Sequence, residues 1–383
     1  MINSTLFSIL NQSGIHLFFL VVDPYLAISL PEVDNFHCIY GQKPLDSQPS
    51  DFVSSTTYTN SGLLLADPQV QQFINQYSQQ PNQTAILVFK PSSKVARLCQ
   101  ENHWHYLANP STTTRQLENK IAFSKLCHQL GITSPPDMIL PFSPDSVRQA
   151  VDSFSLPLVI QAANGWAGNS SFLVSNILQL PAIPIGTPVK FSPYLADHHT
   201  ITLNCVLIDK LFLASPPALQ ITGLSPLTQN PLATVGRQWP VPFTLDPSQL
   251  SAFIDPFIQH LVRLRYQGYF GLDLLYRPQT KLLFLQECNP RLTASFAIFH
   301  QLQIRHQQPS FFLLHLIKLL NLHHLLPRLS QQLITDNLAA TELTAKDTSG
   351  HTIRRIRLDQ PLFTSQSPTP FSLPPQFLSL HLG

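Results

Sequence analysis

The segment GLDLLYRPQTKLLFLQECNPRLTAS, residues 271–295, joins two apolar runs through a turn-like stretch, RPQTK. This arrangement predicts a β-hairpin with strands over 269–276 and 282–289. With the turn centred on Gln279, the odd-numbered positions of both strands share one face, because side chains alternate along a strand. The polar residues of that face are Asp273, Glu287 and Asn289. The opposite face is expected to be the core face and contains Phe270, Leu272, Leu274, Tyr276, Leu282 and Phe284.

Two carboxylates on facing strands repel each other and lose hydration on burial, which is costly unless a cation lies between them. Magnesium prefers hard oxygen ligands and commonly takes one or two carboxylates, an amide oxygen and nucleotide phosphates. Asp273, Glu287 and Asn289 supply such a set, so the hairpin predicts a magnesium site. The alternative is a polar face that is only solvated, but it does not explain a combination that ends in Asn-Pro-Arg.

The first 112 residues alternate apolar strands with helical segments. A helix is expected near 67–80, and a second begins after Ser92 or Ser93, either of which can cap it. The expected strands are 15–22, 37–41, 84–91 and 105–109. Such alternation indicates a parallel, doubly wound α/β domain.

A second unit begins with a predicted helix over 111–132, which Gly131 ends. Its strands are joined by short turns, which is typical of an antiparallel α+β region. They are expected at 156–163, 170–175, 189–195, 199–209 and 210–215. A helix over 248–266, which Pro256 should kink or start late, leads into the hairpin. The polar segment 218–240 between these parts is expected to be a surface loop, although its Gln220, Arg237 or Trp239 could contact substrate.

The hairpin closely resembles the metal-binding hairpin of the ATP-grasp superfamily, in which an Asp or Glu on one strand and a Glu-x-Asn pair on the next hold the magnesium bound to ATP. The resemblance covers most of residues 1–300, specifically at the hairpin and loosely elsewhere. It implies an N-terminal, doubly wound pre-ATP-grasp domain over 1–112, followed by a two-lobed ATP-grasp domain with antiparallel sheets. The implied divisions of the remaining chain are the ATP-grasp domain at 113–305, its lid subdomain at about 133–190, its metal-binding lobe at about 191–305, and a closing subdomain at 306–383 with a Pro-rich tail.

The resemblance also implies roles for individual residues. Asp273, Glu287 and Asn289 would bind magnesium, and Arg291 would steady the transferred phosphoryl group or acyl phosphate. Lys120, in the predicted helix over 111–132, would reach the ATP phosphates. Taken without the resemblance, Lys120 is an ordinary solvated helix lysine.

The loop over 163–171 would form the nucleotide lid, where the backbones of Gly165 and Gly168 can approach phosphates closely. An ordinary hairpin turn would have a similar sequence. Gln161 stands where the family usually carries a phosphate-binding lysine, so the attraction for phosphate must be weaker there or supplied elsewhere.

The segment VKFSPYL, residues 189–195, resembles the hinge whose backbone holds the adenine, with Lys190 and Phe191 nearest to the base. The alternative is that this segment is simply an apolar strand.

These residues imply an ATP-dependent ligase that activates a carboxylate as an acyl phosphate for attack by an amine or similar nucleophile, releasing ADP and phosphate. Its partners would be small-molecule carboxylate and amine substrates, and because such ligases often pair, a homodimer is expected. Gln161 motivates one alternative, a catalytically degenerate nucleotide-binding or scaffold protein. A carboxylase-like ligase that uses bicarbonate is a second alternative.

The composition excludes other classes. The chain has 23 basic and 21 acidic residues and no long basic run, which argues against a nucleic-acid partner. Its longest apolar stretches, 15–22 and 311–320, are shorter than the roughly 20 residues of a membrane helix. The N-terminus lacks the basic region of a secretory signal, so a cytoplasmic protein is expected. The five cysteines show no zinc-like spacing and are expected to be buried thiols.

Overall fold

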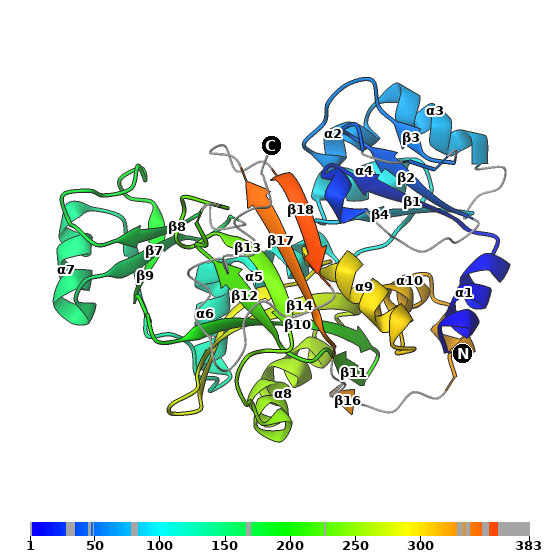
Figure 1. Cartoon of the computed structure of the whole chain (residues 1–383). Helices are drawn as coiled ribbons and strands as arrows, with labels where there is room; N and C mark the ends of the chain where they lie inside the picture. Colours follow the sequence, from blue (N-terminus) through cyan, green and yellow to red (C-terminus); the bar gives the residue numbers. More distant parts are fainter. Residues whose placement is uncertain are drawn as a thin grey trace.

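The computed structural model describes residues 2–27, 35–44, 47–48, 50–77, 83–165, 170–225, 227–327, 332–333, 338–346 and 352–358. The described residues form three sheets of five, nine and four strands. Figure 1 shows the five-stranded and four-stranded sheets on opposite sides of the molecule, with the large sheet between them. None of the helices within these described ranges is long and apolar enough to cross a membrane.

The N-terminal domain contains a parallel sheet in the order β3-β2-β1-β4-β5, as the sequence predicts. Its elements are α1 (Ile2–Gln12), β1 (His16–Val21), η1 (Pro24–Leu26), β2 (Phe36–Tyr40), β3 (Phe52–Val53), α2 (Ser61–Leu65), α3 (Pro68–Tyr77), β4 (Thr84–Val88), α4 (Ser93–Glu101) and β5 (His105–Tyr106). The Ser92 side chain caps α4 by accepting a hydrogen bond from the backbone of Val95.

Both faces of this parallel sheet are buried, which explains why its central strands are almost wholly apolar. One face packs against α2, α3 and α4. The other packs against α1 and the later helices α9 (Phe296–Arg305) and α10 (Phe311–Leu319), with Phe19 against Phe296 and Phe36 against Phe312. The N-terminal domain is therefore fixed to the rest of the chain by a shared core.

The helix predicted over 111–132 is two helices, α5 (Ser111–Glu118) and α6 (Lys120–Gln129), which meet at Asn119. The single-helix prediction is wrong because the Asn119 side chain accepts hydrogen bonds from the backbones of Ile121 and Ala122 and starts a new helix. The backbone N–H of Lys120 then donates to the carbonyl oxygen of Ala163, at 2.9 Å. This break places Lys120 at the junction between α6 and the lid.

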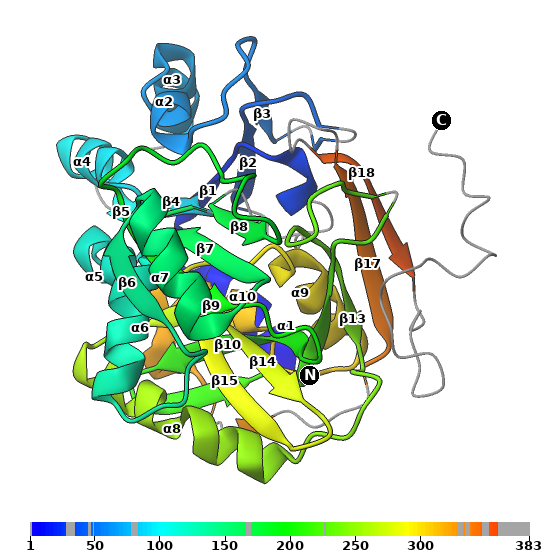
Figure 2. The same ribbon diagram turned by 90° about the vertical axis from the view of Figure 1, so that its left-hand side faces the viewer.

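The lid is the four-stranded antiparallel sheet, in the order β6-β9-β7-β8. Its elements are β6 (Met138–Pro141), α7 (Pro144–Phe154), β7 (Leu158–Ala162), β8 (Ser171–Val174) and β9 (Pro188–Pro193). Helix α7 packs on one face and forms a small core with Ile160, Val189 and Phe191. In Figure 2 the lid is turned toward the viewer, and strands of the large sheet lie below it in the view.

The large sheet follows the order β15-β14-β10-β12-β13-β17-β18; off this path, β11 pairs with β10 and β16 pairs with β11. Its strands are β10 (His199–Ile208), β11 (Leu211–Ala214), β12 (Ala218–Thr222), β13 (Thr234–Trp239), β14 (Gly268–Arg277), β15 (Leu282–Asn289), β16 (Gln332–Leu333), β17 (Ala340–Lys346) and β18 (Thr352–Leu358). The C-terminal strands thus continue this sheet. The Leu-rich stretch at 310–325 forms α10 and the turn η2 (His323–Leu325), and the Pro-rich tail lies outside the described residues.

One expectation for this half of the chain is wrong, and another fails in one of its two alternatives. Residues 218–240 contain β12 and β13, both largely buried, because their apolar side chains pack within the sheet. Helix α8 (Pro247–Arg263) begins before Pro256, so the late start does not occur. The helix packs its apolar stripe on β10 and the hairpin.

The predicted hairpin is present as β14 and β15, but its register differs from the expected one. Asp273 opposes Glu287, whereas Leu274 opposes Leu285, so Gln286 is an extra, bulged residue. Between the bulge and the turn, Phe284 opposes Leu275 and lies on the Asp273 face, contrary to prediction. If the pairing between the turn and Leu274 continued without the bulge, Glu287 would point to the opposite face. The extra residue therefore places Glu287 on the same face as Asp273.

Replacing Asn119 by Ala should lower the free energy of unfolding by about 1 kcal/mol, because two backbone donors of α6 lose their acceptor. Urea denaturation measures the difference. Asn119→Ser is the control, since a serine hydroxyl can accept at the same position and should retain most of the stability. Equal losses in both variants would show that the cap does not stabilise α6.

Candidate functional site

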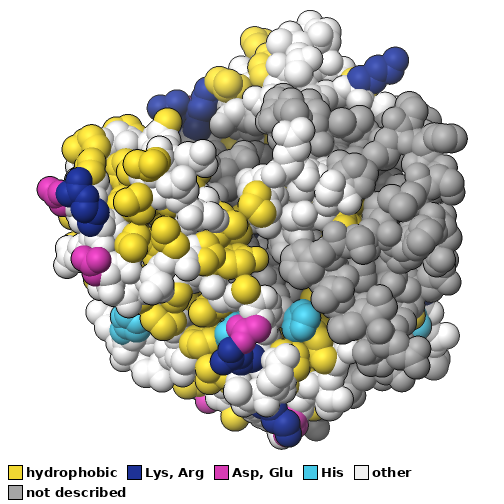
Figure 3. Space-filling view, turned by 60° about the vertical axis from the view of Figure 1, so that its left-hand side comes forward, with side chains coloured by type: hydrophobic (Ala, Val, Ile, Leu, Met, Phe, Trp, Pro, Cys, Tyr) yellow, Lys and Arg dark blue, Asp and Glu magenta, His cyan; other side chains and the backbone are white. Residues whose placement is uncertain are grey.

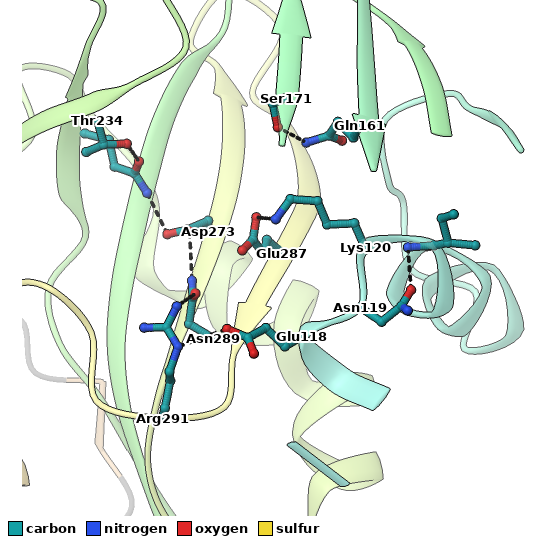
Figure 4. A network of polar contacts seen from close by, with 12 residues as sticks. Glu118, Asn119, Lys120, Gln161, Ser171, Thr234, Asp273, Glu287, Asn289 and Arg291 are labelled. Atoms are coloured by element: carbon teal, nitrogen blue, oxygen red, sulfur yellow. Dashed lines mark hydrogen bonds and ion pairs between the residues drawn. The ribbon is translucent and has the colours of Figure 1, made fainter. Parts of the chain in front are cut away.

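Asp273 and Glu287 lie side by side on the hairpin face that is turned toward the lid (Figure 4). The Asp273 carboxylate accepts hydrogen bonds from Thr202, from the Gln220 amide at 2.6 Å and from the Asn289 amide at 3.0 Å. Burial raises the pKa of Asp273, and the nearby charge of Glu287 raises it further. The predicted pair of facing carboxylates is therefore present, and burial and mutual repulsion disfavour the ionised form of Asp273.

A lysine relieves part of this charge. The Lys120 ammonium lies 2.8 Å from a carboxylate oxygen of Glu287, and only 6% of the Lys120 surface is exposed. Figure 4 shows its side chain reaching from the start of α6 across to the hairpin. The sequence predicts Lys120 at the phosphates, and the structure brings it to the carboxylates that were predicted to hold the metal.

Arg291 lies beyond Asn289, where four groups hold its guanidinium. Its Nε donates to Glu118 at 3.1 Å, its Nη2 donates to the Asn289 side-chain oxygen at 3.0 Å, and its Nη1 donates to the Leu292 carbonyl oxygen at 3.1 Å. The guanidinium carbon lies over the Phe89 ring, 5.0 Å from its centroid. Glu118 also pairs with Lys90 at 3.0 Å. A hydrogen-bonded chain thus runs from Asp273 through Asn289 to Arg291 and Glu118.

Burial alone would raise the pKa of Glu118, but Arg291 and Lys90 outweigh it and hold this pKa below its ordinary value. Sequence reasoning missed both Glu118 and Lys90. Glu118 directly precedes the Asn-Lys pair that was predicted to contribute to the site, and this adjacency was the available signal. Lys90 carries no such signal because only the packing of the N-terminal domain brings it here.

On the lid, Gln161 and Lys190 oppose each other on adjacent strands, with 6% and 4% of their surfaces exposed. The Gln161 amide donates to the Ser171 hydroxyl at 3.0 Å. Burial lowers the pKa of Lys190. Phe191 points the other way, into the core beneath α7, so its side chain does not reach this face.

Gly165 follows β7 with φ +152°, and a side chain there would overlap that of Ser170. Only glycine fits this position without displacing Ser170. Gly168 lies outside the described residues, so the loop that was predicted to cover phosphates is described only at its two ends.

The oxygen atoms gathered here suit a hard cation, and they would fill only part of its coordination sphere, leaving positions for water or phosphate. Across the described ranges, no cluster of three or more His, Cys, Asp or Glu residues could hold a metal by itself. Asp273 and Glu287 offer two carboxylates, and the Asn289 amide oxygen, which accepts a hydrogen bond from Arg291 in this structure, could join them only by leaving that partner. Magnesium commonly completes such a set with water and phosphate. The described part of the face shown in Figure 3 carries few charged and many hydrophobic side chains.

No family model matches the chain, and no curated protein is similar to it in sequence. Solved structures share its fold. They include N5-carboxyaminoimidazole synthetase from Staphylococcus aureus complexed with ADP, with 13% identity and a TM-score of 0.58, covering 87% of this chain and 83% of that one. Biotin carboxylase from Campylobacter jejuni, in a complex with a β,γ-ATP ligand, has 13% identity and a TM-score of 0.65, covering 88% and 78%.

A third match is the biotin carboxylase domain dimer of Hydrogenobacter thermophilus 2-oxoglutarate carboxylase, in complex with MgADP, ADP and bicarbonate. It has 12% identity and a TM-score of 0.63, covering 87% of this chain and 75% of that one. These enzymes have the ATP-grasp fold, so the predicted resemblance and the predicted fold class are confirmed.

Replacing Glu118 by Gln should lower the free energy of unfolding by about 3 kcal/mol near neutral pH, because the buried Arg291 cation loses its carboxylate. The folded-state pKa of Glu118 is lowered, so its stabilisation is complete above the ordinary value of 4.5 and is lost as the pH falls through the lower folded-state pKa. Urea unfolding from about pH 7 down to about pH 3 should show the difference shrinking at the acid end.

Glu101→Gln is the matched control, because this exposed glutamate pairs with the exposed Arg97 at 3.5 Å and should change stability by about 0.5 kcal/mol or less. A Glu118 variant as stable as this control at neutral pH would show that the Glu118–Arg291 pair does not stabilise the site.

Proposed function

We propose that this protein is an ATP-dependent ligase that activates a carboxylate as an acyl phosphate and transfers the acyl group to an amine or similar nucleophile. The observation that carries the proposal is the facing pair Asp273 and Glu287, with Asn289 beside them and Lys120 and Arg291 at hand, within an ATP-grasp fold. Structures of that fold that bind ADP or ATP support it.

Asp273, Glu287 and Asn289 would hold magnesium, which would neutralise phosphate charge when bound. The hydrogen bonds from Thr202 and Gln220 fix the Asp273 carboxylate in place before any ligand arrives. Lys120 now pairs with Glu287 and would exchange that carboxylate for a phosphate oxygen.

In the proposed first step, a carboxylate oxygen of the substrate forms a bond to the γ-phosphorus of ATP, the bond from that phosphorus to the bridging oxygen breaks, and ADP leaves. In the second step the amine nitrogen attacks the acyl carbon, phosphate leaves with its electron pair, and the amine loses a proton. Arg291 would donate hydrogen bonds to the phosphoryl oxygens as their charge develops. Its contacts with Glu118, Asn289 and Phe89 hold the guanidinium in advance, so little reorganisation is needed.

Bicarbonate is a second candidate for the activated carboxylate. The solved structures that share the fold include carboxylases by name, and one of them contains bicarbonate. In that case the nucleophile would become carboxylated, and ADP release would require bicarbonate.

The proposal extends to the setting of the reaction. We place the protein in the cytoplasm, with small-molecule partners and without nucleic acid or membrane. A homodimer is part of the proposal, as the Hydrogenobacter thermophilus domain is a dimer in its structure.

Calorimetry with ADP should detect binding that strengthens on addition of magnesium. In an Asp273→Asn, Glu287→Gln variant the magnesium-dependent part should fall by at least about tenfold, because both anionic ligands are lost. A double variant of two exposed carboxylates, Glu101→Gln with Asp145→Asn, should bind as the wild type does. Wild-type protein that binds no ADP with or without magnesium would favour a degenerate scaffold over a ligase.

ADP release should appear when ATP and magnesium are supplied with a panel of small carboxylates and amines, and Glu287→Gln should slow it roughly a hundredfold or more. With the most active pair, an ¹⁸O label in the carboxylate should be transferred to phosphate, because the acyl phosphate keeps one carboxylate oxygen on phosphorus. ADP release without label transfer would contradict the acyl phosphate. Release that requires bicarbonate would select the second candidate.

A further inference from the structure

Lys190 is a buried lysine on the face of the lid that looks toward the hairpin. Its neighbours in the strand, Val189 and Phe191, point into the core beneath α7, so Lys190 points to the opposite face. It pairs in register with Gln161 on β7, and directly opposed residues of an antiparallel pair share a face. Only 4% of its surface is exposed.

The Lys190 ammonium has no direct counter-ion. Within the described part of the chain, no hydrogen bond or ion pair joins it to another residue, although Asp137 and Glu287 are near enough to act on its charge. Each of these carboxylates is already engaged, Asp137 by the Ser124 hydroxyl and Glu287 by Lys120 at 2.8 Å. A buried ammonium without a partner is costly to folding, and burial accordingly lowers the pKa of Lys190.

A second cation lies close by. Lys120 is near enough to Lys190 for their charges to interact. Both lysines also interact electrostatically with Glu287, although Lys120 belongs to α6 and Lys190 to β9. Two buried ammonium groups repel each other, so their convergence is unfavourable until a strongly negative ligand is present. A phosphate chain has the charge and the oxygen atoms to accept hydrogen bonds from both.

We propose that Lys190 binds the phosphate chain of the nucleotide together with Lys120, and so supplies from β9 the positive charge that Gln161 on the adjacent strand cannot supply. The assignment rests on the proposed function and deepens it. It moves Lys190 from the adenine, where the hinge resemblance placed it, to the phosphates. Gln161 then has a local role, since its amide donates to Ser171.

The test compares Lys190→Gln with the wild type by calorimetry in magnesium, using three probes: ADP, inorganic tripolyphosphate and adenosine. Affinity for ADP and tripolyphosphate should fall about 10- to 100-fold, because a charge-assisted contact to phosphate is lost, and affinity for adenosine should not change. Lys125→Gln is the matched control, since this exposed lysine lies on α6 and should leave all three affinities unchanged.

A second variant moves the charge instead of removing it. Gln161→Lys combined with Lys190→Gln returns a lysine to the same face of the lid, one strand away, and should recover most of the lost affinity for ADP and tripolyphosphate. Recovery would show that the positive charge, and not the packing of Lys190, is what the ligand requires.

Thermal unfolding without ligand separates a binding role from a structural one. Lys190→Met should melt at the same temperature as the wild type or higher, because it removes an unpaired buried charge while keeping the length of the side chain. A clear fall in melting temperature would show that Lys190 stabilises the fold, and would overturn the assignment.

The binding data can overturn the assignment in two other ways. Unchanged affinity of Lys190→Gln for ADP and tripolyphosphate, or an equal loss for adenosine, would remove Lys190 from the phosphates while the proposed function stands. Wild-type protein that binds neither ADP nor tripolyphosphate would overturn the proposed function, and this assignment with it.

Discussion

The other groups of this site depend on the repulsion between the facing carboxylates Asp273 and Glu287. Two like charges on adjacent buried strands destabilise the fold unless positive charge lies nearby. In the structure that charge comes from Lys120, and Asp273 is held by neutral donors. Its raised pKa shows that these donors do not fully offset burial and the charge of Glu287. The pair is therefore unfavourable as a purely structural feature, which supports the magnesium site proposed for it.

The compensating groups come from three parts of the fold. Lys120 comes from the helix break at Asn119, Arg291 from the end of β15, and Lys190 from the lid. Each is buried or fixed by contacts that do not involve a ligand, so the site is largely formed before binding. The shared core between the N-terminal sheet and α9 and α10 also matters, because it brings Lys90 to Glu118 and so completes the support of Arg291.

The bulge at Gln286 shows how a local irregularity can decide chemistry. From the turn to Leu274 the hairpin pairs in a register that would turn Glu287 toward the core under α8. The extra residue reverses the side-chain alternation and returns Glu287 to the polar face. The expected register placed Glu287 and Asn289 on the face of Asp273, as observed, but its uniform ladder paired Asp273 with Leu285 and assigned Leu282 and Phe284 to the wrong face.

The sequence by itself determined the parallel N-terminal sheet, the antiparallel lid and hairpin, and the polar residues of the hairpin, because hydrophobic periodicity and turn residues act over short distances along the chain. It could not determine the bulge at Gln286, the pairing of Arg291 with Glu118 and Lys90, or the position of Lys190 opposite Gln161. These depend on contacts between segments far apart in the chain. Only tertiary packing sets strand register and brings buried charges together, so only the folded structure could reveal them.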